Sequence, residues 1–131
     1  MKDIRSNLKF EHYIVDYVEF KNNPDFEGEE ATLEFNPRAE FNVDGKELLV
    51  FLTIDVFPEA IKRNYPFEMS VCVVGYFTIS DEENIEKYKT NAVAVLFPYV
   101  RSIISTYTAL ANVNPLILPT VNINRMLAET K

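Results

Sequence analysis

Few residues in this chain have the types and spacing that catalysis needs. His12 is the only histidine and Cys72 the only cysteine, so an intrachain disulfide and a cysteine metal cluster are both excluded. Asp55 lies in an apolar run, where burial can turn a carboxylate into a general base. No nucleophile is near it in sequence, and there is no glycine-rich phosphate loop. We therefore expect no enzyme, no cofactor and no metal, with Asp55 a strand-end or interface residue and Cys72 a small buried side chain.

Composition limits the remaining classes. The chain has 131 residues, of which 47% are hydrophobic and 25% charged, so we expect one folded domain over residues 1–131. The net charge of -7 and the scattered Lys and Arg residues argue against nucleic acid, and an acidic surface suits a basic partner. The N-terminal stretch MKDIRSNLKFEHY has no apolar run of signal-peptide length, which predicts a cytoplasmic protein.

The clearest pattern in the first half of the chain is alternation of apolar and polar residues. The segment 32-TLEFNPRAEFNV-43 predicts a strand with one buried face, and Pro37 predicts an edge position or a bulge there. Asp44-Gly45 predicts a two-residue type I′ hairpin turn. The next strand, 48–57, is almost wholly apolar, so we expect it to be central and covered on both faces.

Two further segments have the composition of strands. Residues 8–20 are rich in aromatic and β-branched side chains, and residues 67–80 alternate. A polar connector, 58–66, is bracketed by prolines. Together these segments predict four strands in an antiparallel sheet.

The last third of the chain predicts helices. Ser80 or Asp81 is a suitable N-cap for a helix that extends to about Asn112. Pro98 predicts a break or kink in it, with the regular part from Pro98 to about Ala111, because proline removes a hydrogen bond and restricts the residue before it.

Beyond this helix, prolines predict an extended connector over 113–121. Asn122 or Asn124 then caps a short last helix that ends near Glu129. The predicted fold is therefore α+β: a four-stranded antiparallel sheet, one long, kinked helix and a short C-terminal helix.

The predicted long helix is unusual because Arg101 is the only charged residue between Thr90 and Asn124. Polar residues interrupt this tail, which disfavours membrane insertion. A helix without a charged face is usually buried on both sides, and a second copy across a two-fold axis is the simplest cover for the side away from the sheet. The alternative is a neutral, solvated face. The residues predicted to contact a second copy are Tyr99, Arg101, Ser102, Ser105, Thr106, Thr108 and Ala109.

Several segments, in order along the chain, resemble the SecB family of bacterial export chaperones. The most specific are 96-LFPYVRSIIS-105 and, before the short last helix, 116-LILPTVN-122. The segments 74-VGYFTIS-80, 35-FNPRAEFNVD-44 and 13-YIVDYVEF-20 are similar to strands of that family.

This resemblance implies a four-stranded sheet with two helices, assembled as a dimer of dimers, that is, a homotetramer. Members of the SecB family are ATP-independent chaperones that hold unfolded polypeptides in apolar grooves and keep them competent for export or folding. In many bacteria they deliver these polypeptides to the SecA motor. Matched to the family's groove, the implied client-binding residues are Phe35, Phe41, Val43, Phe67, Met69, Val71, Leu116, Leu118, Ile123 and Leu127.

The SecA contact is the least well matched part of the resemblance. Asp16 matches the family's acidic position on the first strand, whereas Ser70 occupies the fourth-strand position and Glu68 lies two residues away. The family's glycine pair is reduced to Val74-Gly75. Two hypotheses therefore stay open: an export chaperone that uses SecA, and a dedicated chaperone of one client, such as the antitoxin of a toxin–antitoxin system. An adaptor for one folded partner is a third.

Overall fold

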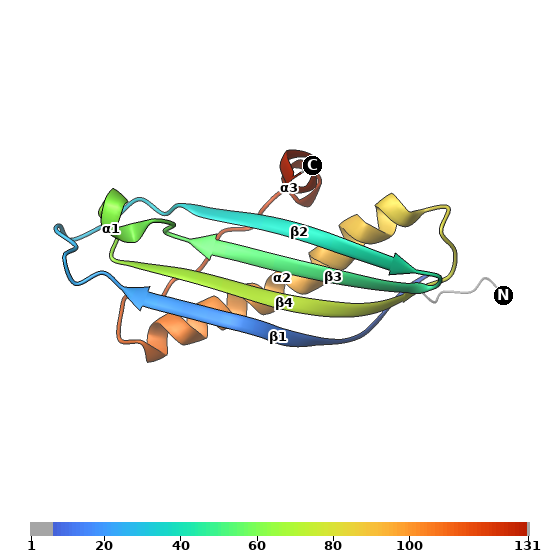
Figure 1. Cartoon of the computed structure of the whole chain (residues 1–131), viewed down its shortest axis with the longest axis horizontal. Coiled ribbons are helices and arrows are strands. Elements are labelled where there is room, and N and C mark those ends of the chain that lie inside the picture. Colours follow the sequence, from blue (N-terminus) through green and yellow to red (C-terminus); the bar gives the residue numbers. More distant parts are fainter. Residues whose placement is uncertain (1–6, 131) are drawn as a thin grey trace.

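The computed structural model describes residues 7–130 and shows a four-stranded antiparallel sheet with helices (Figure 1). The strands have the spatial order β1-β4-β3-β2, so β1 and β2 form the two edges. The edge position predicted from Pro37 and the α+β fold are thus confirmed. The elements are β1 (Leu8–Asn22), β2 (Phe35–Asp44), β3 (Glu47–Val56), α1 (Ala60–Arg63), β4 (Phe67–Ile79), α2 (Ile85–Leu110) and α3 (Ile123–Thr130).

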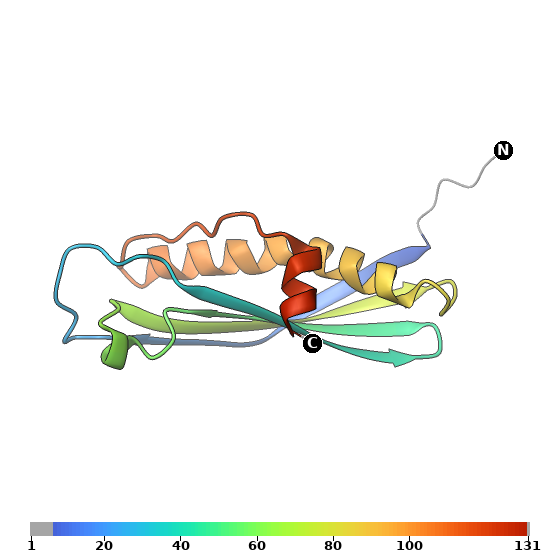
Figure 2. The same cartoon turned by 90° about the horizontal axis from the view of Figure 1, so that it is seen from above.

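The core lies between the sheet and α2, which crosses one face of it (Figure 2). We call this the inner face and the opposite one the outer face. Alternation puts every second residue of β3 and β4 on the inner face, where Leu52 and Val73 are fully buried against α2 residues such as Leu96. One side of α2 is thereby buried over most of its length.

Gly75 of β4 lets α2 approach the sheet closely. A Cβ atom at this position would lie 2.7 Å from Leu96 Cδ1 and 2.7 Å from Phe77 Cε1, which is too short for a carbon contact. The glycine therefore sets the spacing between the two layers near the middle of α2.

Two expectations about β3 need correction. Its central position is confirmed, but among the described residues no element covers its outer face, where Leu49 and Phe51 stay partly exposed. The hairpin turn before it consists of Gly45 and Lys46 rather than Asp44 and Gly45. Of the turn residues only Gly45 has a positive φ, 59°, as in a type II′ turn, because β2 extends one residue further than predicted.

The sequence predicts a break or a kink at Pro98, and of these two the break does not occur, since α2 is one uninterrupted helix. Proline removes the N–H that would bond the carbonyl of Ala94. Both residues are exposed, so water can hydrate this carbonyl and the helix continues.

The N-cap of α2 is Asn84, which lies after the two predicted residues, Ser80 and Asp81. Asp81 instead accepts the N–H groups of Glu83 and Asn84 in the preceding turn.

By length and composition alone, α2 is able to cross a membrane. The same is true of many helices that form the core of a globular domain, and α2 packs one side against the sheet.

Asn122 caps α3 as predicted, because its Oδ1 accepts the N–H of Arg125 at 3.1 Å.

Candidate functional site

A groove of about 600 Å³ opens between β2 and α3. Four consecutive residues of β2 line it, although neighbouring side chains of a strand point to opposite faces. The groove therefore lies beside the outer edge of β2 and not over one face of the sheet, and we call it the edge groove. Its lining residues are Phe35, Asn36, Pro37, Arg38, Val121, Asn122, Arg125 and Met126.

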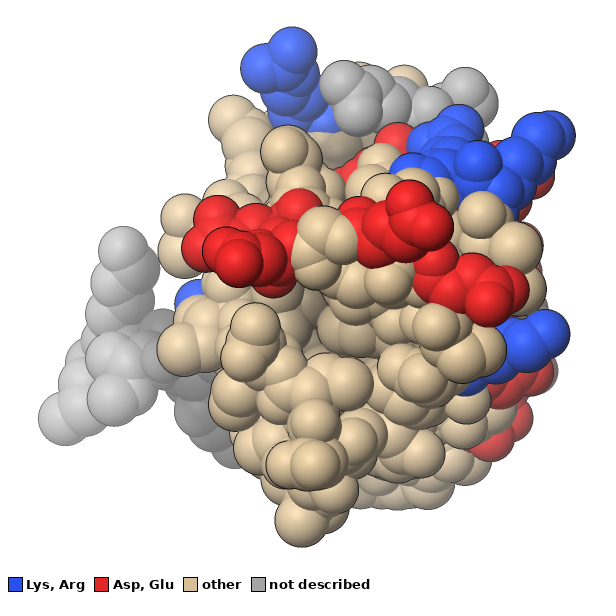
Figure 3. Space-filling view, turned by 90° about the vertical axis from the view of Figure 1, so that its left-hand side faces the viewer, with Lys and Arg blue, Asp and Glu red and all other residues tan. Residues whose placement is uncertain are grey.

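A second hollow, of about 280 Å³, lies between the loop after β1 and the connector after α2. We call it the end hollow. Its lining is mostly apolar and includes Phe26, Phe67 and Leu116, together with Glu29 and Glu30. Figure 3, which views this end of the molecule, shows a band of acidic side chains above an uncharged surface.

Large apolar side chains are exposed close to the connector. Leu110 at the end of α2 is 81% exposed and Ile117 is 74% exposed. Because such residues are normally buried, this part of the chain offers apolar contact area for another polypeptide.

Hydroxyl groups of α2 hold the connector in place. The Thr108 hydroxyl accepts the N–H of Leu116 at 2.9 Å, and the Ser105 hydroxyl donates to the carbonyl of Leu116 at 2.9 Å. Both backbone groups of Leu116 are therefore satisfied by side chains, as a neighbouring strand would satisfy them. This fixes one wall of the end hollow.

The loop after β1 is anchored by Asn23, which is 5% exposed. Its Nδ2 donates to the carbonyls of Ala60 at 3.2 Å and Tyr65 at 2.8 Å, and its Oδ1 accepts the N–H of Asp25. The other wall of the end hollow is thus tied to the segment around α1. Sequence reasoning missed Asn23, although an Asn-Pro pair after a strand is a recognisable turn signal.

The residues predicted to line the client groove fall into two groups. Phe67, Met69, Val71 and Leu118 are at most 3% exposed and belong to the core. The first three occupy inner positions of β4 beneath α2, and Leu118 belongs to the connector after α2. The others are partly buried or exposed: Phe35, Phe41, Val43, Leu116, Ile123 and Leu127. Phe35 alone lines the edge groove, and Phe67 and Leu116 line the end hollow. Client contacts of all ten stay predictions.

The α2 residues that are predicted to contact a second copy also fall into a buried and an exposed group. We call the side of α2 that faces away from the sheet the open face. Thr108 is fully buried and bonds within its own chain, so its assignment to the open face needs correction. Tyr99, Ser102, Thr106 and Ala109 are exposed, and Ser105 is partly buried. Arg101 is partly buried, and its Nε has no hydrogen-bond partner among the described residues. Contacts of these residues with a second copy stay predictions.

The two residues predicted to contact SecA lie in different hollows of the outer face. Asp16 lines a small one beside Cys72. Glu68 lines another, of about 400 Å³, and its cross-strand partner is Lys21. Along the strands they are about 15 Å apart at roughly 3.3 Å per residue.

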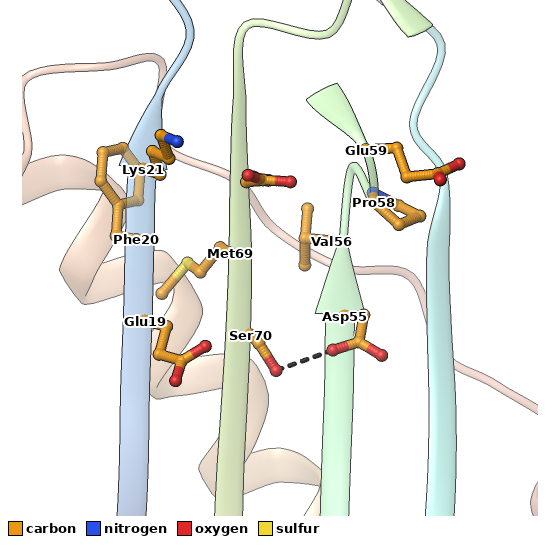
Figure 4. Close-up of a pocket in the computed structure, with 10 residues that line it drawn as sticks. Glu19, Phe20, Lys21, Asp55, Val56, Pro58, Glu59, Met69 and Ser70 are labelled. Carbon is orange, nitrogen blue, oxygen red and sulfur yellow. Dashed lines mark hydrogen bonds between the residues drawn. The ribbon is translucent and has the colours of Figure 1, made fainter. Parts of the chain in front are cut away.

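The hollow at Glu68 is acidic, and we call it the acidic hollow. Glu19, Asp55 and Glu59 also line it, with Lys21 the only cation among its lining residues. Figure 4 shows Glu19, Ser70 and Asp55 on neighbouring strands, with Ser70 Oγ bonded to Asp55 Oδ1 at 2.7 Å. Sequence reasoning missed Glu19, which strand alternation places on the outer face opposite Ser70.

Asp55 and Cys72, which were considered above as candidates for catalysis or metal binding, have contacts typical of structural residues. Asp55 makes an ion pair with Arg38 and accepts the Ser70 hydroxyl. Cys72 is 4% exposed, and burial raises the pKa of its thiol, so the thiol stays protonated. Within residues 7–130, no group of three or more His, Cys, Asp or Glu side chains is arranged to hold a metal ion.

The sequence matches the family described as "Preprotein translocase subunit SecB" over residues 11–131. The chain belongs to the SecB family. A relative from Methanocaldococcus jannaschii, the uncharacterized protein MJ0357, is 40% identical over 130 residues, which cover 93% of this chain and 83% of that protein.

Solved structures share the SecB fold of this chain. One is the SecB-like chaperone Rv1957 of Mycobacterium tuberculosis in complex with a ChAD peptide from the Rv1956 HigA1 antitoxin. Its TM-score is 0.69 at 12% identity, covering 88% of each chain. A second, a protein of unknown function from Streptococcus agalactiae, has a TM-score of 0.50 at 16% identity, covering 86% of this chain and 97% of that one.

Proposed function

We propose that this SecB-family protein is an ATP-independent holdase that binds unfolded or partly folded polypeptides through apolar surface. The observation that carries the proposal is the open edge groove, which Phe35, Pro37, Val121 and Met126 line with apolar side chains, in a chain of this family. The end hollow and the exposed Leu110 and Ile117 add further apolar contact area. Peptide binding by the M. tuberculosis chaperone of the same fold is consistent with it. We place its action in the cytoplasm.

The energetics fit a holdase better than an enzyme or an adaptor for one folded partner. Each fully buried apolar side chain of a client contributes about 1.5–3 kcal/mol. Separate hollows on one molecule then bind a long unfolded chain by multivalency, which needs no ATP and no specific sequence.

The proposal is tested by diluting an unrelated urea-unfolded protein into this one and measuring mass by light scattering after size-exclusion chromatography. We expect a stable complex. If the unfolded protein aggregates as it does alone and forms no complex, this result contradicts holdase activity.

Phe35→Asp should weaken client binding roughly tenfold, because a carboxylate in the edge groove loses the apolar contact and resists desolvation. Ile61→Asp is the matched control, since Ile61 is 59% exposed on α1 and lines none of the hollows described above. Client affinity is measured by fluorescence titration. If both variants bind the client as tightly as the unchanged protein does, Phe35 is not part of the binding surface.

We also propose a homotetramer, built through the sheet edges and the open face of α2.

For the partner protein there are two candidates. The acidic hollow fits a basic segment such as the tail of SecA, whereas Lys21 opposite Glu68 weakens that fit and favours a dedicated client, such as an antitoxin. Binding of many unrelated unfolded chains together with SecA supports export, and binding of one polypeptide without SecA supports the dedicated chaperone.

A further inference from the structure

We propose that residues 24–30, in the loop after β1, form a hinged flap at the end hollow, and that the Asn64 side chain is its latch. One wall of the hollow then opens and closes, while the wall at the connector after α2 stays fixed. This motion is a property of the folded chain and does not depend on the proposed holdase function.

The loop that contains the flap crosses one end of the sheet, because it joins the two edge strands β1 and β2. Figure 2 shows it rising from the sheet to the level of α2 at that end. The loop is anchored on both sides of the flap. Before the flap, the N–H of the buried Asn23 donates to the carbonyl of Pro66 at 3.0 Å. After it, the Glu34 carboxylate accepts from Arg63 at 2.7 Å, and the Glu34 carbonyl accepts the N–H of Phe57 at 2.8 Å.

Between these anchors the flap has little contact with the core. Its residues are exposed except Phe26, which is partly buried, lines the end hollow and lies outside the core cluster. The N–H groups of Asp25 and Phe26 bond to Asn23, at the base of the flap itself. Segments with few buried apolar contacts and few hydrogen bonds to the rest of the fold open locally, without unfolding of the domain.

One side chain fastens the flap to the rest of the chain. Asn64 Oδ1 accepts the N–H of Glu27 at 3.0 Å, and Asn64 Nδ2 donates to the carbonyl of Glu27 at 2.8 Å. Within residues 7–130, these are the only hydrogen bonds between the flap and a residue other than Asn23. Both are exposed, so water can replace them when the flap moves away.

The backbone at Asn64 favours an asparagine in the role of latch. This residue ends α1 with a φ of 56°, a left-handed conformation that glycine and asparagine adopt most readily. Of these two, only asparagine has a side chain that can bond the flap. The latch can therefore be removed by Asn64→Gly without disturbing the end of α1.

Gly28 gives the flap a bend that glycine adopts most easily. Its φ is 122°, in the range where a side chain strains the backbone. A Cβ atom at this position would lie 3.9 Å from Phe26 Cζ, an ordinary contact, so a substitution acts through the backbone and not through a clash. The closed position of Phe26 and Glu27 thus depends on the bend beside them.

Opening of the flap changes the hollow on one side only. It moves Phe26 away from Phe57 and Phe67, which also line the hollow and are 5% and 3% exposed in the closed form. The opposite wall, at Leu116, cannot follow, because side chains of α2 bind both of its backbone groups. The flap therefore controls the width of the hollow and the access of apolar groups to its floor.

Amide hydrogen exchange of the full protein tests this motion. The amides of Phe26 and Glu27 should exchange roughly a hundredfold or more faster than those of Asn23 and Phe57, which bond to the anchoring segments. Asn64→Gly should speed exchange at Glu27 roughly tenfold or more, because two hydrogen bonds are lost. Phe26 should speed up as well, although its N–H does not bond Asn64, since the flap opens as a unit. Asn23, Phe57 and the urea midpoint should change little.

A tryptophan on the flap gives a second readout, because the chain has none of its own. Phe26→Trp places this fluorophore at the end hollow. Adding Asn64→Gly should increase its quenching by acrylamide and shift its emission to longer wavelength, and Gly28→Ala should act in the same direction. Gly45→Ala is the matched control, since Gly45 also has a positive φ, 59°, but lies in the β2–β3 turn.

Three results would overturn the flap. If Glu27 exchanges as slowly as Phe57 in the unchanged protein, the loop opens only with the whole domain. If Asn64→Gly leaves exchange at Phe26 unchanged, Asn64 holds one amide and not the flap. If this variant speeds Phe57 as much as Glu27, Asn64 supports the segment around α1 instead. All three measurements use the protein without a client, so they decide the flap whether or not the urea-unfolded protein forms a complex.

Discussion

At the scale of residues, polar side chains in this protein mainly position backbone segments. Ser105 and Thr108 of α2 satisfy both backbone groups of Leu116, and Asn23 satisfies two carbonyls near α1. These segments form the walls of the end hollow, so a few buried hydrogen bonds determine whether that hollow keeps its shape.

Thr108→Val should lower the free energy of unfolding by about 1–3 kcal/mol, because the buried N–H of Leu116 loses its acceptor. Thr106→Val, at an exposed position on the same helix, is the matched control and should change stability little. Urea denaturation followed by circular dichroism measures both. Equal midpoints for the two variants would show that the Thr108 hydroxyl does not stabilise the connector.

Asp81 should make stability depend on pH. Partial desolvation raises its pKa, but hydrogen bonds from the Tyr88 hydroxyl and the N–H groups of Asn84 and Glu83 outweigh this and leave the pKa below its ordinary value of 3.8. A carboxyl whose pKa is depressed on folding contributes stability above its unfolded pKa, and this contribution is lost as the pH falls below about 4.

Asp81→Asn should therefore reduce stability at neutral pH and flatten its decline under acid. Thermal unfolding between neutral and strongly acidic pH measures this, with the exposed Glu82→Gln as control. A decline as steep as that of the unchanged protein rules out this role for Asp81.

At the scale of elements, the contact between α2 and the sheet decides the thickness of the core. Gly75 permits this contact, and Leu96 fills the space that a side chain would take. A side chain is tolerated at the neighbouring Val74 because that residue points to the outer face, away from α2.

Gly75→Ala should destabilise the fold by about 1–3 kcal/mol, because the added methyl group overpacks the core against Leu96 and Phe77. The double variant Gly75→Ala with Leu96→Ala should recover part of the loss, since the two side chains compete for one space. Denaturant midpoints of the single and double variants test this. Strictly additive losses would show that the two sites do not share that space.

At the scale of the whole molecule, the open face of α2 is the main feature without a described partner. It is exposed, small and uncharged at Ser102, Thr106 and Ala109, and the partly buried Arg101 has an Nε without a hydrogen-bond partner among the described residues. A second copy would cover this face and supply an acceptor for Arg101.

Ser102→Arg should divide the proposed oligomer, because an unpaired charge in a dry interface costs several kcal/mol. Thr120→Arg, at an exposed position of the connector, is the control and should keep the mass unchanged. Light scattering measures the mass of both. An unchanged mass for Ser102→Arg would show that α2 does not form the interface.

The sequence by itself determined the four strands and the two longer helices of this protein, whereas α1 lies within the predicted connector 58–66. Alternation in β2 and β4, the edge position of Pro37 and the cap at Asn122 are local properties, because side-chain periodicity and backbone restrictions act over a few residues. The segment 96–105 and the turn at 116–122 also indicated the SecB family, which the family match confirms.

Only the tertiary structure decided which of the predicted site residues share a surface. Phe67, Met69 and Val71 have the same apolar character as Phe35, yet they lie under α2 while Phe35 lines the edge groove. Thr108 and Ser102 look alike in sequence, and only the first bonds the connector. The reason is physical: periodicity fixes which side of its own element a residue occupies, whereas burial depends on the distant segment that packs there.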